Sequence, residues 1–289
     1  MTAEIINGKA VAEQIQAEIK EEVSQLKKQG IVPGLAVVLV GDDPASQVYV
    51  KNKGIACQKA GINSIEHRKP ADFPEAELLK LIDELNKNPE VDGILVQLPL
   101  PKHINENRVL YAIDPDKDVD GFHPVNVGRL MIGEPMFLPC TPAGIQELIV
   151  RSGTKIEGAE VVVVGRSNIV GKPIAMILVQ KAPNANATVT ICHTKTKNMA
   201  EHTKKADILI VAAGKPMAVT ADMIKPGATV IDVGVNRLET GLCGDVDFEK
   251  AKEVAGKITP VPGGVGPMTI TMLLKNTLKS AKLRLEKKR

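Results

Sequence analysis

The chain has 289 residues and a formal net charge of +3 at pH 7, with 44% hydrophobic and 25% charged residues. These values are typical of a globular protein of one large or two ordinary domains. The small net charge gives no strong attraction to nucleic acid. Two tyrosines, four phenylalanines and no tryptophan leave few surfaces on which bases could stack. We therefore expect no nucleic-acid partner.

The cysteines and the N-terminal residues bear on location and metal binding. The four cysteines, Cys57, Cys140, Cys192 and Cys243, lie far apart, and no pair has the spacing of metal ligands. We expect reduced thiols and no metal site. The first residues include Glu4 and no apolar segment of a secretory signal, and no apolar run reaches the length of a membrane span. The sequence predicts a cytoplasmic protein with no membrane partner.

The first part of the chain alternates between helical and strand patterns. Apolar residues recur at helical spacing over 11–26, and Gly30 and Pro33 then mark the stop. The next expected elements are a strand over 35–40, helices over 46–60 and 78–88, and a strand over 93–98. This alternation predicts a small α/β domain.

From residue 141 the alternation becomes more regular. A helix is expected over 141–151, strands over 160–164, 187–191, 208–212 and 229–233, and a last helix over 269–285. This rhythm predicts an α/β protein with a Rossmann-like, doubly wound parallel-sheet domain over 141–267. Residues 1–140 and 268–289 are expected to form the other domain, with the C-terminal helix returning to it.

Four consecutive valines, 161–164, predict a strand buried on both faces. Gly165 ends this strand, and Gly171 and Pro173 then open a helix. Strand, turn and helix N-terminus form a phosphate site, although a plain strand end followed by a tight turn is the alternative. The turn differs from G-x-G-x-x-G because Arg166 and Ser167 occupy it and because it is one residue longer.

The strand over 187–191 indicates which dinucleotide binds. In NAD-binding domains an acidic residue near the end of this strand binds the ribose 2′-hydroxyl. Here the strand runs into Cys-His-Thr-Lys-Thr-Lys at 192–197, which offers hydroxyls and positive charge but no carboxylate. Arg166 adds a planar phosphate donor. The sequence therefore predicts NADP, while His193 by itself is more often structural or exposed.

A second candidate site begins with Tyr49 and Lys53, which lie four residues apart and so share one helix face. An exposed lysine is the ordinary alternative. Short-chain dehydrogenases use the same Tyr-x-x-x-Lys spacing, but there the pair follows the nucleotide turn. Here it precedes that turn by more than a hundred residues, so this interpretation is rejected.

Gln97, Asp120 and a loop complete the candidate residues. Gln97 ends an apolar strand before two prolines, where ligand crevices of α/β sheets lie. Asp120 belongs to an acidic loop that could be a solvated turn and that lacks the spacing of a calcium loop. The Pro- and Gly-rich loop 260–267 is either a linker or a backbone surface for a planar ligand.

Together these segments resemble the bifunctional methylenetetrahydrofolate dehydrogenase/methenyltetrahydrofolate cyclohydrolase family. The resemblance is carried, in order, by 49–53, 92–101, 118–121, 165–173 and 260–269, and covers essentially the whole chain. It implies NADP-dependent oxidation of 5,10-methylenetetrahydrofolate, then hydrolysis of the methenyl product to 10-formyltetrahydrofolate. It also implies a folate site in the cleft between the domains and a homodimer formed through the NADP domain.

The resemblance implies residue roles as well. Lys53 is the main catalytic residue, Gln97 orients it, Tyr49 stacks on the folate and Asp120 hydrogen-bonds the pterin. The other implied folate-binding residues are Val96, Leu98, Pro262, Gly263, Gly264, Val265 and Gly266. The implied NADP-binding residues are Gly165, Arg166, Ser167, Thr194 and Val235.

The chemistry is consistent with these residue types. Hydride loss needs alignment rather than a strong base, whereas hydrolysis needs a group that moves protons. A lysine does this only when part of its population is neutral, so we expect Lys53 to be unusually buried for a lysine. Two alternatives stay open: a monofunctional dehydrogenase of the same fold, and a nucleotide-binding module that turns over no folate. Length excludes an additional formyltetrahydrofolate synthetase domain.

Overall fold

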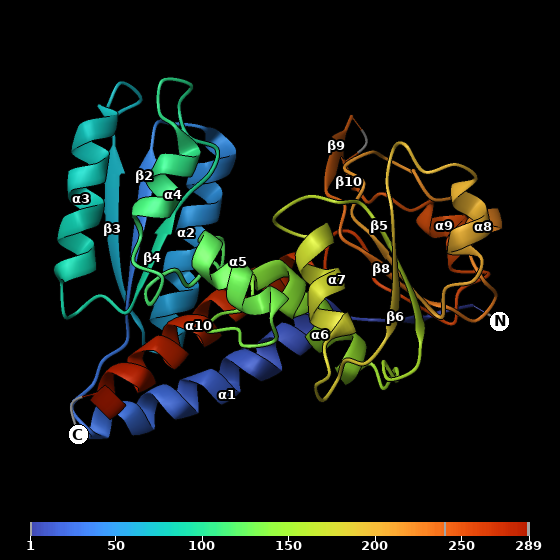
Figure 1. Ribbon diagram of the computed structural model, residues 1–289, viewed down its shortest axis with the longest axis horizontal. Helices are drawn as coiled ribbons and strands as arrows, with labels where there is room; N and C mark the ends of the chain where they lie inside the picture. The colour runs from blue at the N-terminus through green and yellow to red at the C-terminus, as the bar shows by residue number, and fades with distance from the viewer. Residues whose placement is uncertain (1, 240, 288–289) are drawn as a thin grey trace. The chain divides into compact units, whose positions relative to one another are not determined.

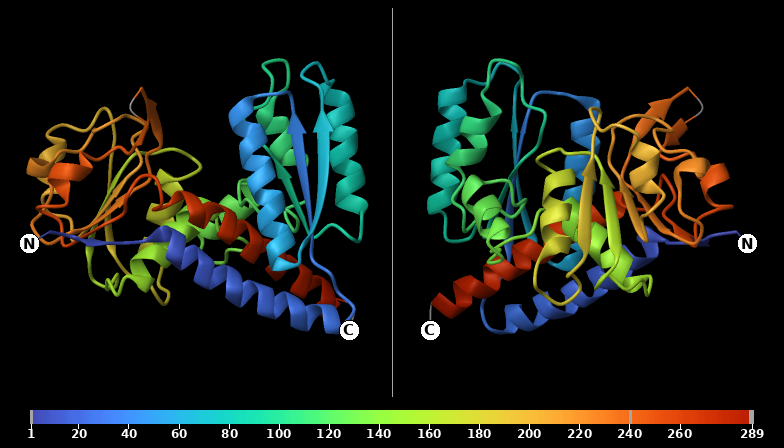
Figure 2. Two further views of the ribbon diagram at one scale, coloured as in Figure 1. Left: turned by 180° about the vertical axis from the view of Figure 1, so that it is seen from behind. Right: turned by 45° about the vertical axis from the view of Figure 1, so that its right-hand side comes forward.

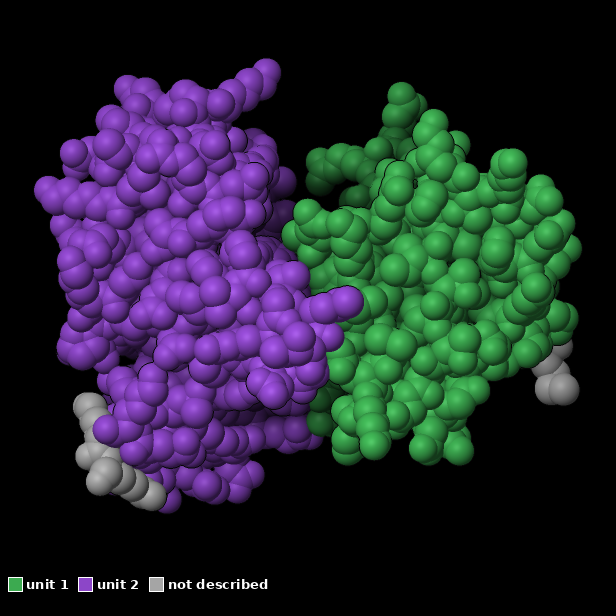
Figure 3. Space-filling view, in the orientation of Figure 1, with its two compact units in different colours: residues 1–13, 141–269 green, residues 14–140, 270–289 purple. Residues whose placement is uncertain are grey.

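The computed structural model describes residues 2–239 and 241–287. The chain forms two units, each assembled from segments far apart in the sequence (Figure 3). Unit 1 consists of residues 1–13 and 141–269, and unit 2 consists of residues 14–140 and 270–289. Among the described helices, none combines the length and apolar character that a membrane span requires.

Unit 2 contains a three-stranded parallel sheet of order β3-β2-β4. Its strands are β2 (Gly34–Val40), β3 (Asn63–Lys69) and β4 (Gly93–Val96). All seven residues of β2 are buried, because helices cover both faces of this central strand. Helices α3 (Glu75–Lys87) and α4 (Glu106–Ala112) share one apolar cluster with Val38 and Ile94, while α2 (Pro44–Ala60) packs on β2 and β3 (Figure 1).

Two long helices, α1 (Gly8–Lys28) and α10 (Gly266–Lys287), lie side by side, as both views of Figure 2 show. Gln16 Nε2 of α1 donates to Thr271 Oγ1 of α10 at 2.8 Å. In unit 2, α10 is joined to β4 by an ion pair in which Arg284 Nε lies 2.7 Å from Asp92 Oδ1. Arg284 also donates to Asp92 Oδ2 at 3.0 Å, which ties the helix to the start of β4.

Unit 1 is built on a six-stranded sheet of order β1-β11-β8-β7-β5-β6, in which every neighbouring pair is parallel. The strands are β1 (Glu4–Ile5), β5 (Glu160–Val164), β6 (Thr188–Cys192), β7 (Ile208–Val211), β8 (Thr229–Asp232) and β11 (Lys257–Ile258). The chain order reverses at β5, since β6 lies on one side and β7 on the other. Dinucleotides bind at such a reversal, beyond the carboxyl ends of the strands.

Short elements surround this sheet. The remaining elements of unit 1 are α6 (Cys140–Arg151), α7 (Gly171–Val179), α8 (Met199–Thr203), the 3₁₀ turn η1 (Ala221–Met223), α9 (Phe248–Ala251) and the antiparallel pair β9 (Asn236–Leu238) and β10 (Gly241–Cys243). Unit 2 also contains α5 (Pro124–Met131). The predicted α/β architecture with a Rossmann-like parallel-sheet domain is confirmed.

The structure differs from the sequence prediction at β1 and β3, where the sequence pattern of a strand is weakest. Strand β1 pairs with β11, so residues 1–13 lie in unit 1 rather than in the other domain. Two residues are too few to show a strand period. Strand β3 was missed because its sequence, Asn-Ser-Ile-Glu-His-Arg-Lys, is polar, as suits a strand at the edge of a sheet.

Candidate active site

Helix α2 and strand β4 bring Lys53 and Gln97 together. The helix begins after Asp43, whose Oδ2 accepts the amide of Ser46 at 2.8 Å. Lys53 lies on one face of α2, and Lys53 Nζ donates a hydrogen bond to Gln97 Oε1 at 3.0 Å. Gln97 is fixed in turn, since its Nε2 donates to the carbonyl of Leu98 at 2.7 Å and its amide donates to Val38 at 2.9 Å.

The exposure of Lys53 differs from the sequence expectation. We expected an unusually buried lysine, but Lys53 is half-buried. Tyr49, one turn before it on α2, is 51% exposed, so its ring is available to a ligand. The four-residue spacing places the two side chains on the same helix face. The hydrogen bond to Gln97 fixes the position of the Lys53 amine, although the side chain is not fully buried.

The loop that carries Asp120 is ordered by hydrogen bonds to the sheet and within itself, and it is not a solvated turn. The amide of Ile94 in β4 donates to Lys117 at 2.9 Å, which ties the loop to the sheet. The buried Asp118 carboxylate accepts the amides of Phe122 at 3.2 Å and His123 at 2.8 Å. Burial raises the pKa of Asp118 to about 6, although these hydrogen bonds and one from Asn126 oppose the shift.

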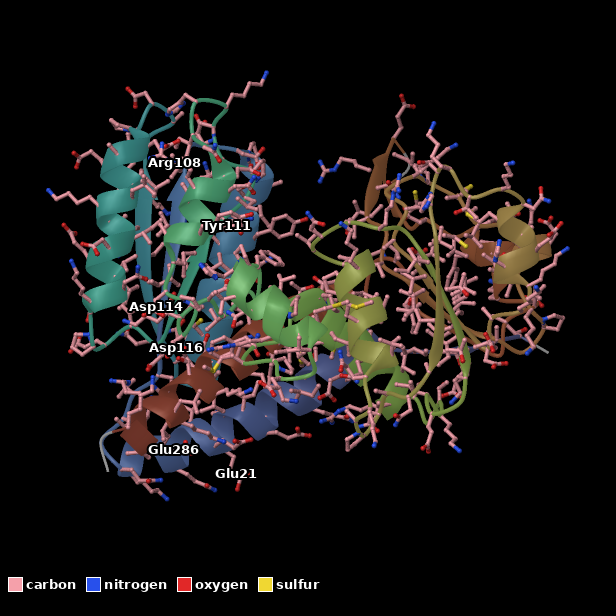
Figure 4. The ribbon with its side chains drawn as sticks, viewed as in Figure 1. Glu21, Arg108, Tyr111, Asp114, Asp116 and Glu286 are labelled. Atoms are coloured by element: carbon pink, nitrogen blue, oxygen red, sulfur yellow. The ribbon has the colours of Figure 1, made fainter. Side chains whose placement is uncertain are left out.

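The other acidic residues of this loop, Asp114 and Asp116, are labelled in Figure 4. Asp114 Oδ1 accepts the amide of Asp116 at 2.9 Å, and Asp116 pairs with Lys287 at 2.9 Å. Neither contact involves Lys53. The described residues contain no group of three or more His, Cys, Asp or Glu side chains arranged to hold a metal.

Asp120 is half-buried, and its carboxyl group lies close to the charge of Lys53. Burial raises the pKa of Asp120, while the Lys53 ammonium and a hydrogen bond from the Cys140 thiol lower it. Lys53 also acts electrostatically on Cys140, whose own pKa burial raises well above its usual value. Unit 2 therefore brings Lys53, Gln97 and Asp120 into one polar site.

Two residues near this site carry no sequence pattern that predicts their place in it. Cys140, 1% exposed, lies with its Sγ 3.4 Å from the carbonyl of Val119. Asn276 of α10 donates to the carbonyls of Val119 at 2.8 Å and Leu138 at 2.9 Å. Both support the backbone beside Asp120. A buried asparagine is unusual in an apolar helix, and this is the one signal that could have identified Asn276.

In unit 1 the turn after β5 has the shape of a phosphate-binding turn. Gly165 has φ of +133°, and a Cβ there would lie 2.2 Å from the carbonyl oxygen of Ala212. A Cβ on Gly171 would lie 2.3 Å from the oxygen of Gly165. Ser167 Oγ accepts the amides of Val170 at 3.1 Å and Gly171 at 3.3 Å, so the turn folds onto the start of α7. Only glycines leave room for this close approach.

The turns after β5 and β6 carry residues that the sequence predicts to bind NADP. The amide of Gly165 donates to Cys192 at 2.8 Å, so the turns after β5 and β6 lie at the same edge of the sheet. Arg166 and Thr194 are exposed there, whereas His193 organises its own loop by accepting the amide of Lys195 at 3.1 Å. Val235, which follows β8 at the same edge, is 58% exposed. The guanidinium of Arg166 and the hydroxyl of Thr194 are donors that suit a phosphate, and NADP binding by these residues and Val235 stays a prediction.

The loop 262–266 packs within unit 1. The oxygen of Gly263 accepts the amide of Lys9 at 3.1 Å, and Val265 is buried. These contacts with the start of α1 are unlike those of a plain linker. The predicted folate residues Pro262, Gly263, Gly264, Val265 and Gly266 thus belong to unit 1, whereas Tyr49, Lys53, Val96, Gln97, Leu98 and Asp120 belong to unit 2. A folate cleft shared by the two domains stays a prediction.

Comparison with known families identifies the chain. Residues 6–120 match the tetrahydrofolate dehydrogenase/cyclohydrolase catalytic domain, and residues 139–285 match the NAD(P)-binding domain of the same family. The chain belongs to the tetrahydrofolate dehydrogenase/cyclohydrolase family. The resemblance predicted from the sequence, and with it an enzyme that uses a nicotinamide dinucleotide, is confirmed.

Individual relatives span the whole chain. It is 63% identical over 290 residues to the bifunctional protein FolD of Syntrophobacter fumaroxidans, covering 98% of each chain. Among solved structures it is similar to the bifunctional FolD of Campylobacter jejuni, at 51% identity and a TM-score of 0.93, covering 97% of this chain and 99% of that one.

A second solved structure, from Trypanosoma brucei, is of a dehydrogenase-cyclohydrolase complexed with NADP cofactor and inhibitor. It has 42% identity and a TM-score of 0.92, and the match covers 99% of both chains. The NAD-dependent dehydrogenase of Saccharomyces cerevisiae shares the fold at 21% identity and a TM-score of 0.80, covering 100% of both chains.

Proposed function

We propose that this chain oxidises 5,10-methylenetetrahydrofolate with NADP and hydrolyses the methenyl product to 10-formyltetrahydrofolate in the same site. The observation that carries the proposal is the 3.0 Å hydrogen bond from Lys53 Nζ to Gln97 Oε1, formed where the charge of Lys53 also reaches the half-buried Asp120. A half-buried lysine held by a neutral amide is suited to proton transfer.

In the oxidation, the residues of this chain bind and align the substrate. Tyr49 offers its exposed ring to the folate, and the Asp120 carboxylate accepts hydrogen bonds from the amino and ring N–H groups of the pterin. NADP, held by residues of unit 1, would supply the acceptor for the hydride that leaves the methylene carbon. The product cation is delocalised over two nitrogens, so the step needs alignment and no strong base.

In the hydrolysis, Lys53 moves the protons. As water attacks the methenyl carbon, the neutral amine of Lys53 accepts a proton from it. The resulting ammonium then returns a proton to the leaving nitrogen as the bond from carbon to N5 breaks. The remaining hydroxyl on the carbon loses its proton to solvent as the carbonyl forms, which leaves the formyl group on N10. Gln97 Oε1 holds Nζ in place without adding a negative charge beside it.

The preference for NADP rests on unit 1. Arg166 supplies a guanidinium and Thr194 a hydroxyl at the exposed edge after β5 and β6, and residues 192–197 contain no carboxylate. An acidic residue at this position would repel a 2′-phosphate, whereas a guanidinium binds it with paired hydrogen bonds.

A coupled assay tests the proposal against the monofunctional alternative. The purified chain is given 5,10-methylenetetrahydrofolate and NADP, and both NADPH and 10-formyltetrahydrofolate are measured. We expect both products. NADPH without enzymatic formation of 10-formyltetrahydrofolate would favour a monofunctional dehydrogenase, and neither product would reject the proposed function.

The oligomeric state and the cellular location of the chain are also part of the proposal. We propose a homodimer formed through the NADP domain, which the family resemblance supports, as does the position of β6 at the border of its sheet. Sedimentation of the purified chain at micromolar concentration tests it, and a monomer mass would contradict it. The cytoplasmic location also stays a prediction.

A further inference from the structure

Two buried carboxylates in unit 1 take no part in the chemistry proposed above. Asp232 ends β8 and is 2% exposed, and Asp245 follows β10 and is 0% exposed. They are neighbours, because Asp232 Oδ1 accepts the amide of Asp245 at 2.9 Å and its Oδ2 accepts the amide of Val246 at 2.9 Å. Within the described residues, the hydrogen bonds of both carboxylates come from N–H donors.

Asp245 holds the loop that follows β7. Its Oδ2 accepts the amides of Ala213 at 2.7 Å and Gly214 at 2.8 Å, and its Oδ1 accepts the amide of Lys215 at 3.0 Å. These three residues are exposed, whereas the carboxylate that binds them is buried. Three consecutive N–H groups around one anion fix the course of the backbone.

The same pair of carboxylates holds the loop that follows β8. Asn236 Nδ2 donates to Asp245 Oδ1 at 2.9 Å, and the amide of Gly234 donates to Asp232 Oδ1 at 3.0 Å. The residues on both sides of Val235 are therefore fixed, while Val235 itself is 58% exposed. A Cβ on Gly234 would lie 2.3 Å from the Asp245 carboxylate, so the two loops are in close contact.

These loops adjoin the phosphate-binding turn. The backbone of Ala212, next to the anchored loop, lies where a Cβ of Gly165 would be. In a doubly wound sheet the half of the dinucleotide that carries the nicotinamide lies over the strands on this side of the reversal. Asp245 thus joins both loops at the edge where that half of the cofactor would bind.

We propose that Asp245 is a positioning residue for the dinucleotide, which holds residues 213–215 and Asn236 in the arrangement that binds the nicotinamide half. The proposal rests on the proposed function only for the identity of the cofactor.

The test is Asp245→Asn. The side-chain amide of this variant keeps one accepting oxygen, but its NH₂ group faces N–H groups that also donate. About half of the four hydrogen bonds that the Asp245 carboxylate accepts are therefore lost. We expect the NADP dissociation constant, measured by fluorescence titration without folate, to rise about tenfold or more. Amide hydrogen exchange at residues 213–215 should accelerate in the folded variant. Cyclohydrolase activity, measured without NADP, should stay within about twofold.

Asp247→Asn is the matched control. Asp247 lies two residues further along the same segment, where its Oδ2 pairs with Lys250 at 3.2 Å, and its replacement makes the same change of charge. We expect NADP affinity and exchange at 213–215 to stay at the wild-type level.

An NADP dissociation constant within about twofold of wild type in Asp245→Asn would overturn the proposal, as would unchanged exchange at 213–215. If Asp245→Asn does not fold, Asn236→Ala tests the proposal instead, since it removes only the hydrogen bond from Asn236 Nδ2 to Asp245 Oδ1. There we expect affinity to fall about threefold or more, and unchanged affinity would overturn the proposal. Failure of the wild type to turn over folate rejects the proposed function but leaves the NADP titration and the exchange measurement valid.

Discussion

Two carboxylates of unit 2 lie beside cations, whereas the buried pair of unit 1 and the buried Asp118 of unit 2 are held by neutral N–H groups. In unit 2, Asp92 and Asp120 each lie near a cation, Arg284 and Lys53 respectively. In unit 1, Asp232 and Asp245 accept hydrogen bonds from neutral N–H groups. A cation near a carboxylate can bind or exchange protons with a substrate, whereas backbone dipoles fix a shape and carry no mobile charge. The Lys53–Asp120 pair is consistent with the proton chemistry proposed for unit 2, and the amide-held pair is consistent with the cofactor positioning proposed for unit 1.

The largest effect should come from removing the cation of the active site. Lys53→Met keeps much of the side-chain volume but removes the amine, so cyclohydrolase activity should fall by about a thousandfold or more. NADP should still bind, since its proposed residues lie in unit 1. Lys51→Met, at an exposed position of the same helix, is the control and should retain activity. Normal hydrolysis in Lys53→Met would refute the catalytic assignment.

Breaking the Arg284–Asp92 pair should destabilise unit 2. Arg284→Met leaves the 1% exposed Asp92 side chain without this partner, and the free energy of unfolding should fall by about 3 kcal/mol. Urea denaturation measures the change. Lys287→Met removes an exposed pair with Asp116, 71% and 42% exposed, and should cost about 0.5 kcal/mol or less. Equal effects of the two substitutions would remove the distinction between buried and exposed pairs.

The amide-held Asp232 should make stability depend on pH. Burial is the main cause that raises its pKa to about 6, despite three amide hydrogen bonds that oppose the shift, and the neighbouring Asp245 charge raises it further. Because the folded state holds the proton more tightly than the unfolded chain, this contribution is present below about pH 4 and lost as pH rises through 6. It amounts to roughly 2–3 kcal/mol.

Asp232→Asn tests this contribution. Denaturation midpoints between pH 4 and 7 should fall less steeply in the variant than in the wild type, because the substituted side chain does not titrate. Asp118, whose pKa is also raised to about 6, remains in both proteins and supplies the residual slope. Identical slopes for variant and wild type would show that Asp232 does not titrate in this range.

The smallest effect concerns the exposed cation of unit 1. Arg166→Ala should weaken NADP binding by roughly tenfold and NAD binding much less, because only NADP carries the 2′-phosphate. Titration with both dinucleotides measures the ratio of the two affinities, and Lys172→Ala, in the first turn of α7, is the control. Equal weakening of both dinucleotides would remove the argument for NADP preference.

Much of the fold and part of the site could be predicted because their causes are local. A run of valines, a helical repeat and a glycine turn each reflect the conformation of a few neighbouring residues, and β5 begins and ends where the sequence predicts. Gln97 was suspected from a polar residue at an apolar strand end, and the structure joins it to Lys53.

The rest depends on contacts between distant segments. The pairing of β1 with β11 brings together residues about 250 positions apart in the chain, and no local pattern marks it. Asp245 follows a glycine in a polar stretch that reads as a surface loop, yet it is completely buried. The half-burial of Lys53 could not be predicted either. Helical spacing shows which residues share a face of the helix but not how deeply that face is buried.

The close fit between Asp232 and Gly244 constrains recombination of this gene. A Cβ on Gly244 would lie 1.8 Å from Asp232 Oδ2, and one on Gly234 would meet Asp245. Each carboxylate occupies the space that the glycine of the other segment leaves free. A chimera with a crossover between residues 234 and 244 would combine loops from two parents at this contact, so a library of hybrids should exchange 232–246 as one block.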